Sequence, residues 1–331
     1  MRRFEYLRAG TVADAVKALA AVPDARALAG GTNLVDLMKY DVARPSRVVD
    51  INRLPLRAIE ETAQGGLRIG SLVTNSDLAW DSRIERGWPL LASAILAGAS
   101  PQLRNAATTG GNLLQRTRCY YFYDPATPCN KREPGSGCPA IEGRNRIHAI
   151  LGTSAACIAT HPSDMCVALA ALDAIVHVEG PAGSRTIAFD EFHRLPGDTP
   201  HLDNTLQQGE LVVAVELPPG RAGCTYTYLK LRDRLSYAFA LVSVAVAMEM
   251  DGATITEARL ALGGVAHKPW RDPEAEASLH GQSIGRENFR RVAEAILRDA
   301  KGFGHNTFKI ELAKRGIVRA LTRAATMEGH S

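Results

Sequence analysis

A long stretch without hydrophobic periodicity interrupts this chain and limits how it can fold. It runs from about Gln115 to Ala156, is rich in proline, glycine and arginine, and contains three cysteines. A stretch this long inside a compact domain is usually functional or disordered. The consecutive aromatic residues Tyr120 to Tyr123 argue against disorder. We therefore expect something other than a hydrophobic core to hold this segment, and its cysteines are the obvious means.

The six cysteines are distributed unevenly. Five lie between Cys119 and Cys166, and Cys224 stands alone. No spacing is a C-x-x-C pair, which disfavours zinc without excluding it. Four thiolates that converge in space can hold an iron–sulfur cluster, and long gaps allow this. One or two disulfides, or reduced thiols in a loop, remain open on spacing alone. Cys166 falls in an apolar helical pattern, where a small buried thiol is expected.

The composition is that of an ordinary globular protein. Of 331 residues, 46% are hydrophobic and 22% charged, which excludes a disordered chain. The formal charge of +4 is a small excess from scattered basic residues, so we expect no nucleic-acid partner. The most apolar run, Ala238 to Met248, is too short to span a bilayer. No apolar run follows the basic N-terminus, so we expect no signal peptide and no membrane insertion.

Around the irregular stretch, strand and helix signals alternate in three regions. Residues 1–56 have an α/β pattern, with Thr11 and Asp14 as a capping box before a helix over 12–22. Residues 57–220 mix strands and helices, and residues 221–331 are α+β. Strands are expected at 25–31, 46–52, 66–71, 156–160, 174–180, 210–218, 225–232, 237–250 and 254–264. Helices are expected at 32–40, 89–99 and 165–174, from 273, at 285–300 and at 307–325.

Two pairs of adjacent glycines lie between apolar segments, in Gly30-Gly31-Thr32-Asn33 and Thr109-Gly110-Gly111-Asn112. Without Cβ atoms, glycines let backbone N–H groups approach an anion, and a following helix N-terminus favours it. Neither turn is a Rossmann or P-loop fingerprint, so an ordinary tight turn is the alternative. The two turns together suggest one ligand held from both sides.

We find no convincing catalytic dyad in the sequence. The nine histidines form no H-E-x-x-H set, and no G-x-S-x-G nucleophile elbow occurs. This pattern suits a subunit that moves electrons better than one that activates a substrate, and we assign no catalytic residue.

A series of motifs over nearly the whole chain resembles one known family. In order they are LAGGTNLVDLMK, TTGGNLL, HPSDM, ELVVAVELP, YLKLRDR and ALGGVAHKPWR. They resemble the FAD-binding subunits of molybdenum hydroxylases, the xanthine dehydrogenase and carbon monoxide dehydrogenase superfamily. Most such subunits lack the cysteine-bearing segment, which we name the cysteine insert (residues 115–157). It resembles that of the flavin subunit of bacterial periplasmic aldehyde oxidoreductases, although 4-hydroxybenzoyl-CoA reductase also carries an inserted [4Fe–4S] cluster.

The resemblance implies an α+β fold: a two-subdomain FAD-binding fold of the vanillyl-alcohol-oxidase type and a C-terminal α+β domain of the CO dehydrogenase flavoprotein type. Residues 1–56 and 57–220 would be the FAD-binding subdomains and 221–331 the C-terminal domain. The first glycine turn would cradle the pyrophosphate, and the second turn would form the opposite wall. Asp164 would bond the ribityl or ribose hydroxyls, and an apolar pair would line the flavin or adenine. Lys230 would lie near the isoalloxazine. The implied residues are Ala27, Leu28, Ala29, Gly30, Gly31, Thr32, Asn33 and Leu34, then Thr108, Gly111, Asn112, Asp164, Leu211, Val212 and Lys230. Each has a plainer alternative: Asp164 as a helix cap, Lys230 as a solvated lysine, and the apolar pair as core.

For the cluster, the resemblance implies four ligands: Cys119, Cys129, Cys138 and Cys157. Nearby cations would raise the potential of such a negatively charged cluster, or would contact another subunit. Those cations are Arg116, Arg118, Lys131 and Arg132.

The implied function is electron transfer. An aldehyde would be oxidised to a carboxylate at a molybdenum cofactor in a large partner subunit. Electrons would pass through [2Fe–2S] clusters of a small partner to FAD in this chain and on to an external acceptor, within a heterotrimer. The complex would be periplasmic, exported on a signal carried by the small partner, with the cytoplasm as the alternative.

Two other functions remain open at this point. One is a flavin subunit of an aromatic acyl-CoA reductase. The other is a cysteine-stapled binding module without a redox role.

Overall fold

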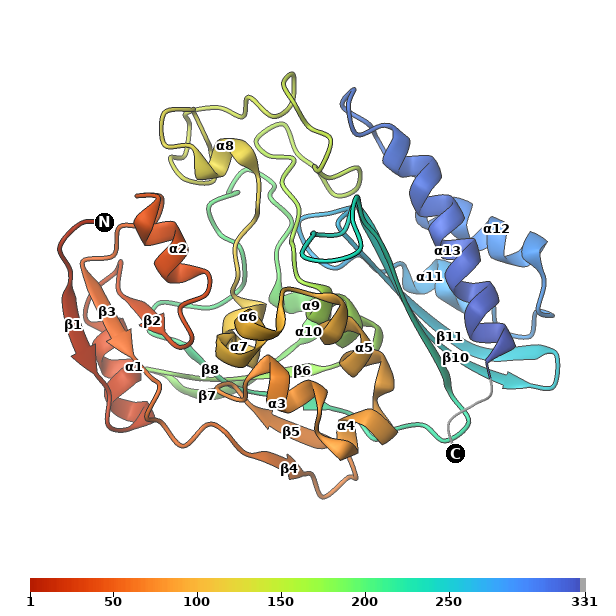
Figure 1. Ribbon diagram of the computed structural model, residues 1–331, viewed down its shortest axis with the longest axis horizontal. Coiled ribbons are helices and arrows are strands. Elements are labelled where there is room, and N and C mark those ends of the chain that lie inside the picture. The colour runs from red at the N-terminus through yellow and green to blue at the C-terminus, as the bar shows by residue number, and fades with distance from the viewer. Residues whose placement is uncertain (328–331) are drawn as a thin grey trace.

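A computed structural model describes residues 1–327 as three β-sheets with helices packed on them (Figure 1). The first sheet is parallel, in the order β1-β3-β2, and two helices accompany it. Its elements are β1 (Glu5–Arg8), α1 (Val12–Ala20), β2 (Arg26–Leu28), α2 (Leu34–Lys39) and β3 (Arg47–Asp50). The predicted capping box is confirmed: the Asp14 N–H donates to Thr11 Oγ1, and the Thr11 N–H donates to Asp14 Oδ2, both at 3.0 Å.

The central sheet has five strands in the order β4-β5-β8-β6-β7, all antiparallel. Short helices cover it and connect it to the first sheet. The strands are β4 (Ile59–Glu61), β5 (Leu67–Gly70), β6 (Ile175–Gly180), β7 (Gly183–Ala188) and β8 (Leu211–Leu217). The helices are α3 (Asn75–Ala79), α4 (Ser82–Gly87), α5 (Pro89–Ala97), α6 (Pro101–Ala106), α7 (Thr109–Leu113), α9 (Asp164–Ala171) and α10 (Phe189–Phe192).

The third sheet is an antiparallel meander in the order β11-β10-β9, with two long amphipathic helices packed along it. Its elements are β9 (Thr225–Leu231), β10 (Val242–Asp251), β11 (Thr254–Gly263), α11 (Pro273–Ala277), α12 (Arg286–Ile296) and α13 (Phe308–Thr326). Helix α9 contacts both β10 and β11, so this sheet packs directly against the central unit. None of the helices in residues 1–327 combines the length and the apolar character needed to cross a membrane.

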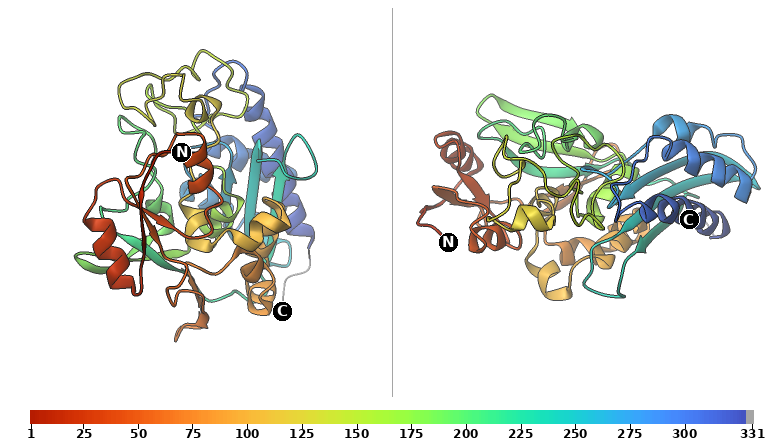
Figure 2. Two further views of the ribbon diagram at one scale, coloured as in Figure 1. Left: turned by 60° about the vertical axis from the view of Figure 1, so that its left-hand side comes forward. Right: turned by 90° about the horizontal axis from the view of Figure 1, so that it is seen from above.

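The cysteine insert lies at one end of the molecule and has almost no regular structure. Its only helix is α8 (Tyr120–Tyr123). Figures 1 and 2 show its yellow loops above the sheets, and from above they lie between the N-terminal sheet and the C-terminal helices. A small core joins Cys119, Phe122 and Cys129 to Leu37 of α2. On the other side, Asn145 Nδ2 donates to the carbonyl of Phe303 at 2.5 Å.

Most expected elements are confirmed, with shifted ends. The strand expected at 156–160 is wrong: these residues form no strand, because Cys157 and Ala159 turn inward to the core beneath the insert. The turn expected around Gly110-Gly111 is a short helix, α7. The pattern missed the edge strands β1, β4 and β7, whose buried faces are too short to show a period. The domain boundaries at 56 and 220 stay predictions.

Candidate functional site

The first glycine turn connects β2 to α2 and presents free backbone donors. Within residues 1–327, the N–H groups of residues 30–33 donate to no other residue. Gly31 has φ +72°, a left-handed conformation that strains other residues. Asn33 Oδ1 accepts from the Arg116 N–H at 2.9 Å, whereas its buried Nδ2 has no partner among the described residues. Consecutive free N–H groups and an unpaired buried amide suit an anionic, hydrogen-bonding ligand.

The second glycine turn is the first part of α7, with Thr108 as its N-cap. Thr108 Oγ1 accepts from the Gly111 N–H at 3.3 Å. A Cβ on Gly110 would lie 2.9 Å from the Ser71 Cβ, so this position needs glycine to let the helix approach β5. Asn112 Oδ1 accepts from the Ser163 hydroxyl at 2.5 Å and from Gln115 Nε2 at 2.8 Å. The side chain of Asn112 thus joins this turn to the start of α9.

The structure brings the two turns together, although almost eighty residues separate them in the sequence. A Cβ on Gly30 would lie 1.8 Å from the carbonyl oxygen of Ala106, the last residue of α6 and three residues before Thr109 of the second turn. The bond from Arg116 to Asn33 adds a second link. The backbones of the two turns are therefore fixed relative to each other, as the resemblance requires for one ligand held from both sides.

Asp164 and Lys230 form a buried ion pair. Lys230 Nζ lies 2.8 Å from Asp164 Oδ2, and both side chains are less than a tenth exposed. The Tyr228 hydroxyl donates to Asp164 Oδ1 at 2.6 Å, and Lys230 also donates to the carbonyl of Ala97. Burial, and then the negative charge of Asp164, raise the pKa of Tyr228 well above its usual value. The alternative of a solvated lysine is therefore wrong. The alternative of Asp164 as a helix cap is also wrong, because the N-cap of α9 is Ser163, whose hydroxyl accepts from the Cys166 N–H.

The two apolar residues of the predicted site lie on opposite faces of β8. Leu211 belongs to the core of the first sheet, and Val212 belongs to the central core. Both are buried in the protein and touch no free surface. The structure places them away from each other, and their contact with a flavin or adenine stays a prediction.

The four predicted cluster cysteines line one cavity. Cys119, Cys129, Cys138 and Cys157 border it together with His148, and all are free thiols. Only the Cys138 thiol is more than slightly exposed. Within the described residues, no three of these sulfurs lie within 4.8 Å of one another. A single tetrahedral zinc ion would need four sulfurs at about 2.3 Å, and hence closer together than this.

Hydrogen bonds connect the thiols with each other and with a histidine. His148 Nε2 lies 3.1 Å from Cys119 Sγ. Burial raises the pKa of the Cys119 thiol to about 12. A hydrogen bond with Cys157 lowers the pKa of the Cys138 thiol to about 6. Hydrogen bonds thus link Cys119 to His148 and Cys138 to Cys157, and the cavity brings Cys129 to the same place. Reduced thiols in a loop stay the alternative to a cluster.

Buried charges hold the insert over the central unit. Lys131, almost fully buried, lies 2.5 Å from Asp203 Oδ1, and Arg116 Nε lies 2.6 Å from Asp203 Oδ2. Burial opposes ionisation of Asp203, but the charges of Lys131 and Arg116 hold its pKa well below the usual range. Both cations pair with Asp203 of this chain, and Lys131 also borders the cavity that the four cysteines line.

The other two insert cations also bond within the chain. The Arg118 guanidinium hydrogen-bonds the Tyr123 hydroxyl, lies 3.5 Å from Asp36 Oδ2, and stacks over Phe239. Arg132 donates to the carbonyls of Tyr121 and Phe122. All four cations therefore help to fold the insert.

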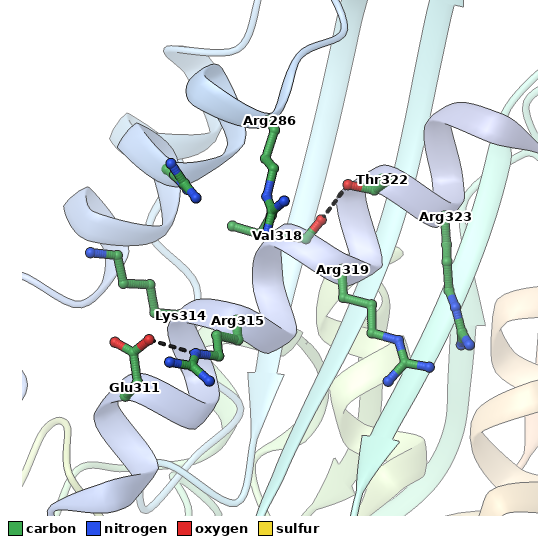
Figure 3. A pocket seen from close by; sticks show the side chains of 9 residues that line it. Arg286, Glu311, Lys314, Arg315, Val318, Arg319, Thr322 and Arg323 are labelled. Carbon is green, nitrogen blue, oxygen red and sulfur yellow. Dashed lines mark hydrogen bonds and ion pairs between the residues drawn. The ribbon is translucent and has the colours of Figure 1, made fainter.

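A basic groove lies elsewhere, between α12 and α13 (Figure 3). The close-up shows Arg286 of α12 extending toward Val318, and Arg319 and Arg323 projecting from α13. Arg315 pairs with Glu311 at 2.6 Å. No glycine turn or cysteine lines this groove. It is a charged face separate from the site described above.

Sequence reasoning missed three residues of the site. His148, Tyr228 and Asp203 contact the predicted residues from distant positions in the chain. Tyr228 stands two residues before Lys230 on one strand, so the period of a β-strand was a usable signal. Nothing in the sequence links His148 to Cys119 or Asp203 to Lys131.

Comparison with known proteins assigns this site to a class. Residues 2–220 match the family described as the FAD binding domain in molybdopterin dehydrogenase. Residues 226–324 match the CO dehydrogenase flavoprotein C-terminal domain. The fold and the paired turns therefore define an FAD-binding subunit of an oxidoreductase, as the motifs predicted.

Similar proteins give the family. The chain is 52% identical over 325 residues to the aldehyde oxidoreductase FAD-binding subunit PaoB of Escherichia coli, covering 98% of this chain and 99% of that one. It is 29% identical over 328 residues to the carbon monoxide dehydrogenase medium chain of Hydrogenophaga pseudoflava, covering 97% of each. A solved carbon monoxide dehydrogenase structure from that organism superposes with a TM-score of 0.77 at 29% identity, over 98% of this chain and 97% of that one. The chain belongs to the FAD-binding subunits of the molybdenum hydroxylase family.

Proposed function

We propose that this chain is the electron-transfer flavoprotein of a molybdenum-containing aldehyde oxidoreductase. The observation that carries the proposal is the 52% identity to an aldehyde oxidoreductase FAD-binding subunit over 98% of the chain, which includes the cysteine insert. The other relatives include medium chains of carbon monoxide dehydrogenase, which are 29% identical or less. In the proposed heterotrimer, a large partner oxidises the aldehyde to a carboxylate at molybdenum. A small partner with [2Fe–2S] clusters delivers the electrons to this chain, which passes them to an external acceptor.

In this proposal, the two glycine turns hold FAD. The free N–H groups of residues 30–33 and the unpaired Asn33 amide fit a pyrophosphate. Gly30 lets the first turn approach the backbone of Ala106, and Gly110 lets α7 approach Ser71. Thr108 fixes the second turn by accepting from the Gly111 N–H. FAD supplies the exit step because it accepts electrons singly and releases them singly or in pairs.

Asp164 and Lys230 have a positioning role in this site. Their ion pair and the Tyr228 bond hold the ammonium group at a fixed place between α5 and α9. A cation near the flavin stabilises negative charge on it. Asp164 Oδ2 is bonded to Lys230 and Oδ1 to Tyr228, which limits how many further groups the Asp164 carboxylate can bind.

We further propose that the insert holds a [4Fe–4S] cluster. Support comes from the donor set, since four thiols border one cavity and lie too far apart for one tetrahedral ion. Each cysteine of such a cluster binds a different iron, which accounts for the wider spacing. The cluster supplies one-electron transfer, whereas the chain holds its ligands in place through Lys131, Arg116 and Arg132.

The test is cofactor analysis and reduction of the purified complex. We expect one FAD with about four irons and four sulfides per chain, and bleaching of the flavin absorption by an aldehyde. Full flavin without iron would overturn the cluster and retain the flavoprotein. Reduction by an aromatic acyl-CoA and not by aldehydes would overturn the substrate class.

A second measurement decides whether the cluster relays electrons. If it does, Cys129→Ser slows FAD reduction by aldehyde at unchanged flavin content. An unaltered rate would make the cluster a structural support of the insert.

A further inference from the structure

The basic groove between α12 and α13 has no role in the site above (Figure 3). It lies between the two helices that pack along the third sheet and has a volume of about 740 Å³. Six cations and one carboxylate, that of Glu311, line it. The cations are Arg286, Arg290, Lys314, Arg315, Arg319 and Arg323. The groove therefore carries a formal charge of +5, whereas the whole chain carries +4.

Helical spacing gathers these cations on two facing helices. Arg315, Arg319 and Arg323 follow one another at intervals of four residues, so they share one face of α13. Arg286 and Arg290 have the same spacing on α12, which packs against α13. Like charges at this spacing destabilise a helix. Packing within the chain therefore gives no reason for the cations to lie together.

Three of the six cations already pair with carboxylates of this chain. The pairs are Arg315 with Glu311, Lys314 with Glu294, and Arg290 with Glu287. For the side chains of Arg286, Arg319 and Arg323, residues 1–327 provide no ion pair and no hydrogen bond. All three are exposed. The groove thus offers three unneutralised guanidinium groups to a ligand from outside the chain.

These guanidinium groups suit carboxylates of a protein better than other anions. A guanidinium binds a carboxylate or a phosphate through two parallel hydrogen bonds. No aromatic side chain of residues 1–327 lines the groove, so it lacks the stacking surface that single-stranded nucleic acids use. A small anion at these exposed side chains would be screened by salt within about 8 Å. A protein segment would instead exclude water and pack on Val318, which borders the groove.

We propose that the basic groove binds an acidic segment of a partner subunit. This inference rests on the proposed function, which supplies the partner. No glycine turn or cysteine lines the groove, so a contact here holds subunits together and takes no direct part in electron transfer. The face from Arg315 to Arg323 is about 12 Å long, which matches about two turns of a partner helix. Such a helix needs carboxylates opposite the three free guanidinium groups and an apolar side chain opposite Val318.

The first test is competition between two forms of the full chain for the same partner subunits. Wild-type chain and Arg319→Glu/Arg323→Glu are produced together with the partners, and native mass spectrometry measures the share of each form in the complex. We expect the share of the variant to be about tenfold lower in the complex than in the total soluble chain, because like charges then face each other. Equal shares would overturn the docking.

Matched variants separate this effect from net charge. Arg86→Glu/Arg291→Glu changes two exposed arginines outside the groove and should assemble as the wild type does. An equal deficit in this control would overturn the proposal. Arg319→Lys/Arg323→Lys keeps the charge and should recover most of the assembly. FAD and iron should stay at wild-type levels in every variant.

The proposed function is measured separately, as reduction of the flavin by an aldehyde in the wild-type complex. If the charge reversal prevents assembly but aldehydes do not reduce the flavin, the activity is overturned and the groove contact is retained. If aldehydes reduce the flavin and both forms assemble equally, the groove contact is overturned and the activity is retained.

A second measurement needs no variant. Phenylglyoxal modifies accessible arginines, and peptide mass spectrometry gives the rate at each one. In the wild-type complex, the three free arginines of the groove should react about tenfold more slowly than Arg86 and Arg291, because a partner covers them. Equal rates would overturn the contact. Slow rates that nuclease treatment restores would assign the groove to a nucleic acid, and would also overturn the proposal.

Discussion

The glycine turns and the cysteine insert bind their proposed cofactors in opposite ways. Each turn uses a few consecutive residues and the backbone itself, so its geometry follows from local conformation. The insert collects four side chains from an irregular segment and depends on buried charges from elsewhere, such as Asp203. Local geometry tolerates changes at a distance, whereas the insert should fail as a unit. The following variants test that difference.

Removal of a cysteine should have the largest effect. In Cys129→Ser we expect loss of nearly all of the about four irons per chain, because a cluster with three thiolates is labile. The flavin should remain near full occupancy, since the turns do not depend on the insert thiols. Iron and flavin analysis of the purified complex measures both. Simultaneous loss of FAD would show that the two regions do not act independently.

Removal of the buried cation should come next. Lys131→Met leaves Asp203 with Arg116 alone and should destabilise the fold by about 3–5 kcal/mol. Thermal unfolding and limited proteolysis would show this loss first in the insert. Lys314→Met is the control, since its pair with Glu294 is partly exposed and worth about 1 kcal/mol or less. Equal effects of the two variants would contradict the role of buried charge.

Acid should loosen the insert before the turns. His267 lies outside the insert, with its Nδ1 2.8 Å from the carbonyl oxygen of Arg194. Burial, and then the charge of the insert residue Lys131, lower the pKa of His267 to about 4. The unfolded chain takes up this proton near pH 6.5, whereas the folded chain takes it up only near pH 4. The free energy of unfolding therefore falls by about 3 kcal/mol for this residue between pH 6.5 and pH 4, and this residue causes no further loss below pH 4. His267→Gln should reduce the slope. Hydrogen exchange of peptides from the insert and from the two turns, measured between pH 6.5 and pH 4, follows this loss of stability. If His267→Gln left the pH dependence unchanged, the assignment of the loss to His267 would be refuted.

A methyl group in the first turn should have the smallest effect of this series. Gly30→Ala places a Cβ 1.8 Å from the Ala106 carbonyl oxygen and must separate the two turns. We expect FAD affinity to fall about 100-fold, a cost of about 2.7 kcal/mol, with iron unchanged. Gly87→Ala, where a Cβ meets nothing within 4 Å, is the control. Titration of the flavin-free protein with FAD would measure the difference, and equal affinities would disprove the close approach.

The sequence was sufficient where structure is local. The capping box at Thr11 and Asp14 predicted α1, and the paired glycines marked both turns. The cysteine set also followed, because the resemblance selected four residues that the structure brings to one cavity. The expected strand at 156–160 failed because its apolar residues face the insert core and not a sheet.

The remaining parts of the site depend on contacts between distant residues. The pairing of Asp164 with Lys230 joins positions 66 apart in sequence, and Lys131 meets Asp203 across 72. Ion pairs of this kind leave no periodic signal. They appear only when the sheets are packed, which is why the roles expected for Lys230 and Lys131 alone were incomplete.

The contacts of the insert with the C-terminal helices have a consequence for synthesis. Lys309 at the start of α13 donates to the carbonyl of His148, and Asn306 donates to the carbonyl of Ala149. The ribosome makes the insert when the chain is less than half complete, long before these partners exist. The insert therefore cannot complete its folding until α13 has been synthesised. Loading of the proposed cluster would then be a late event, and a truncated chain would leave its thiols open to oxidation.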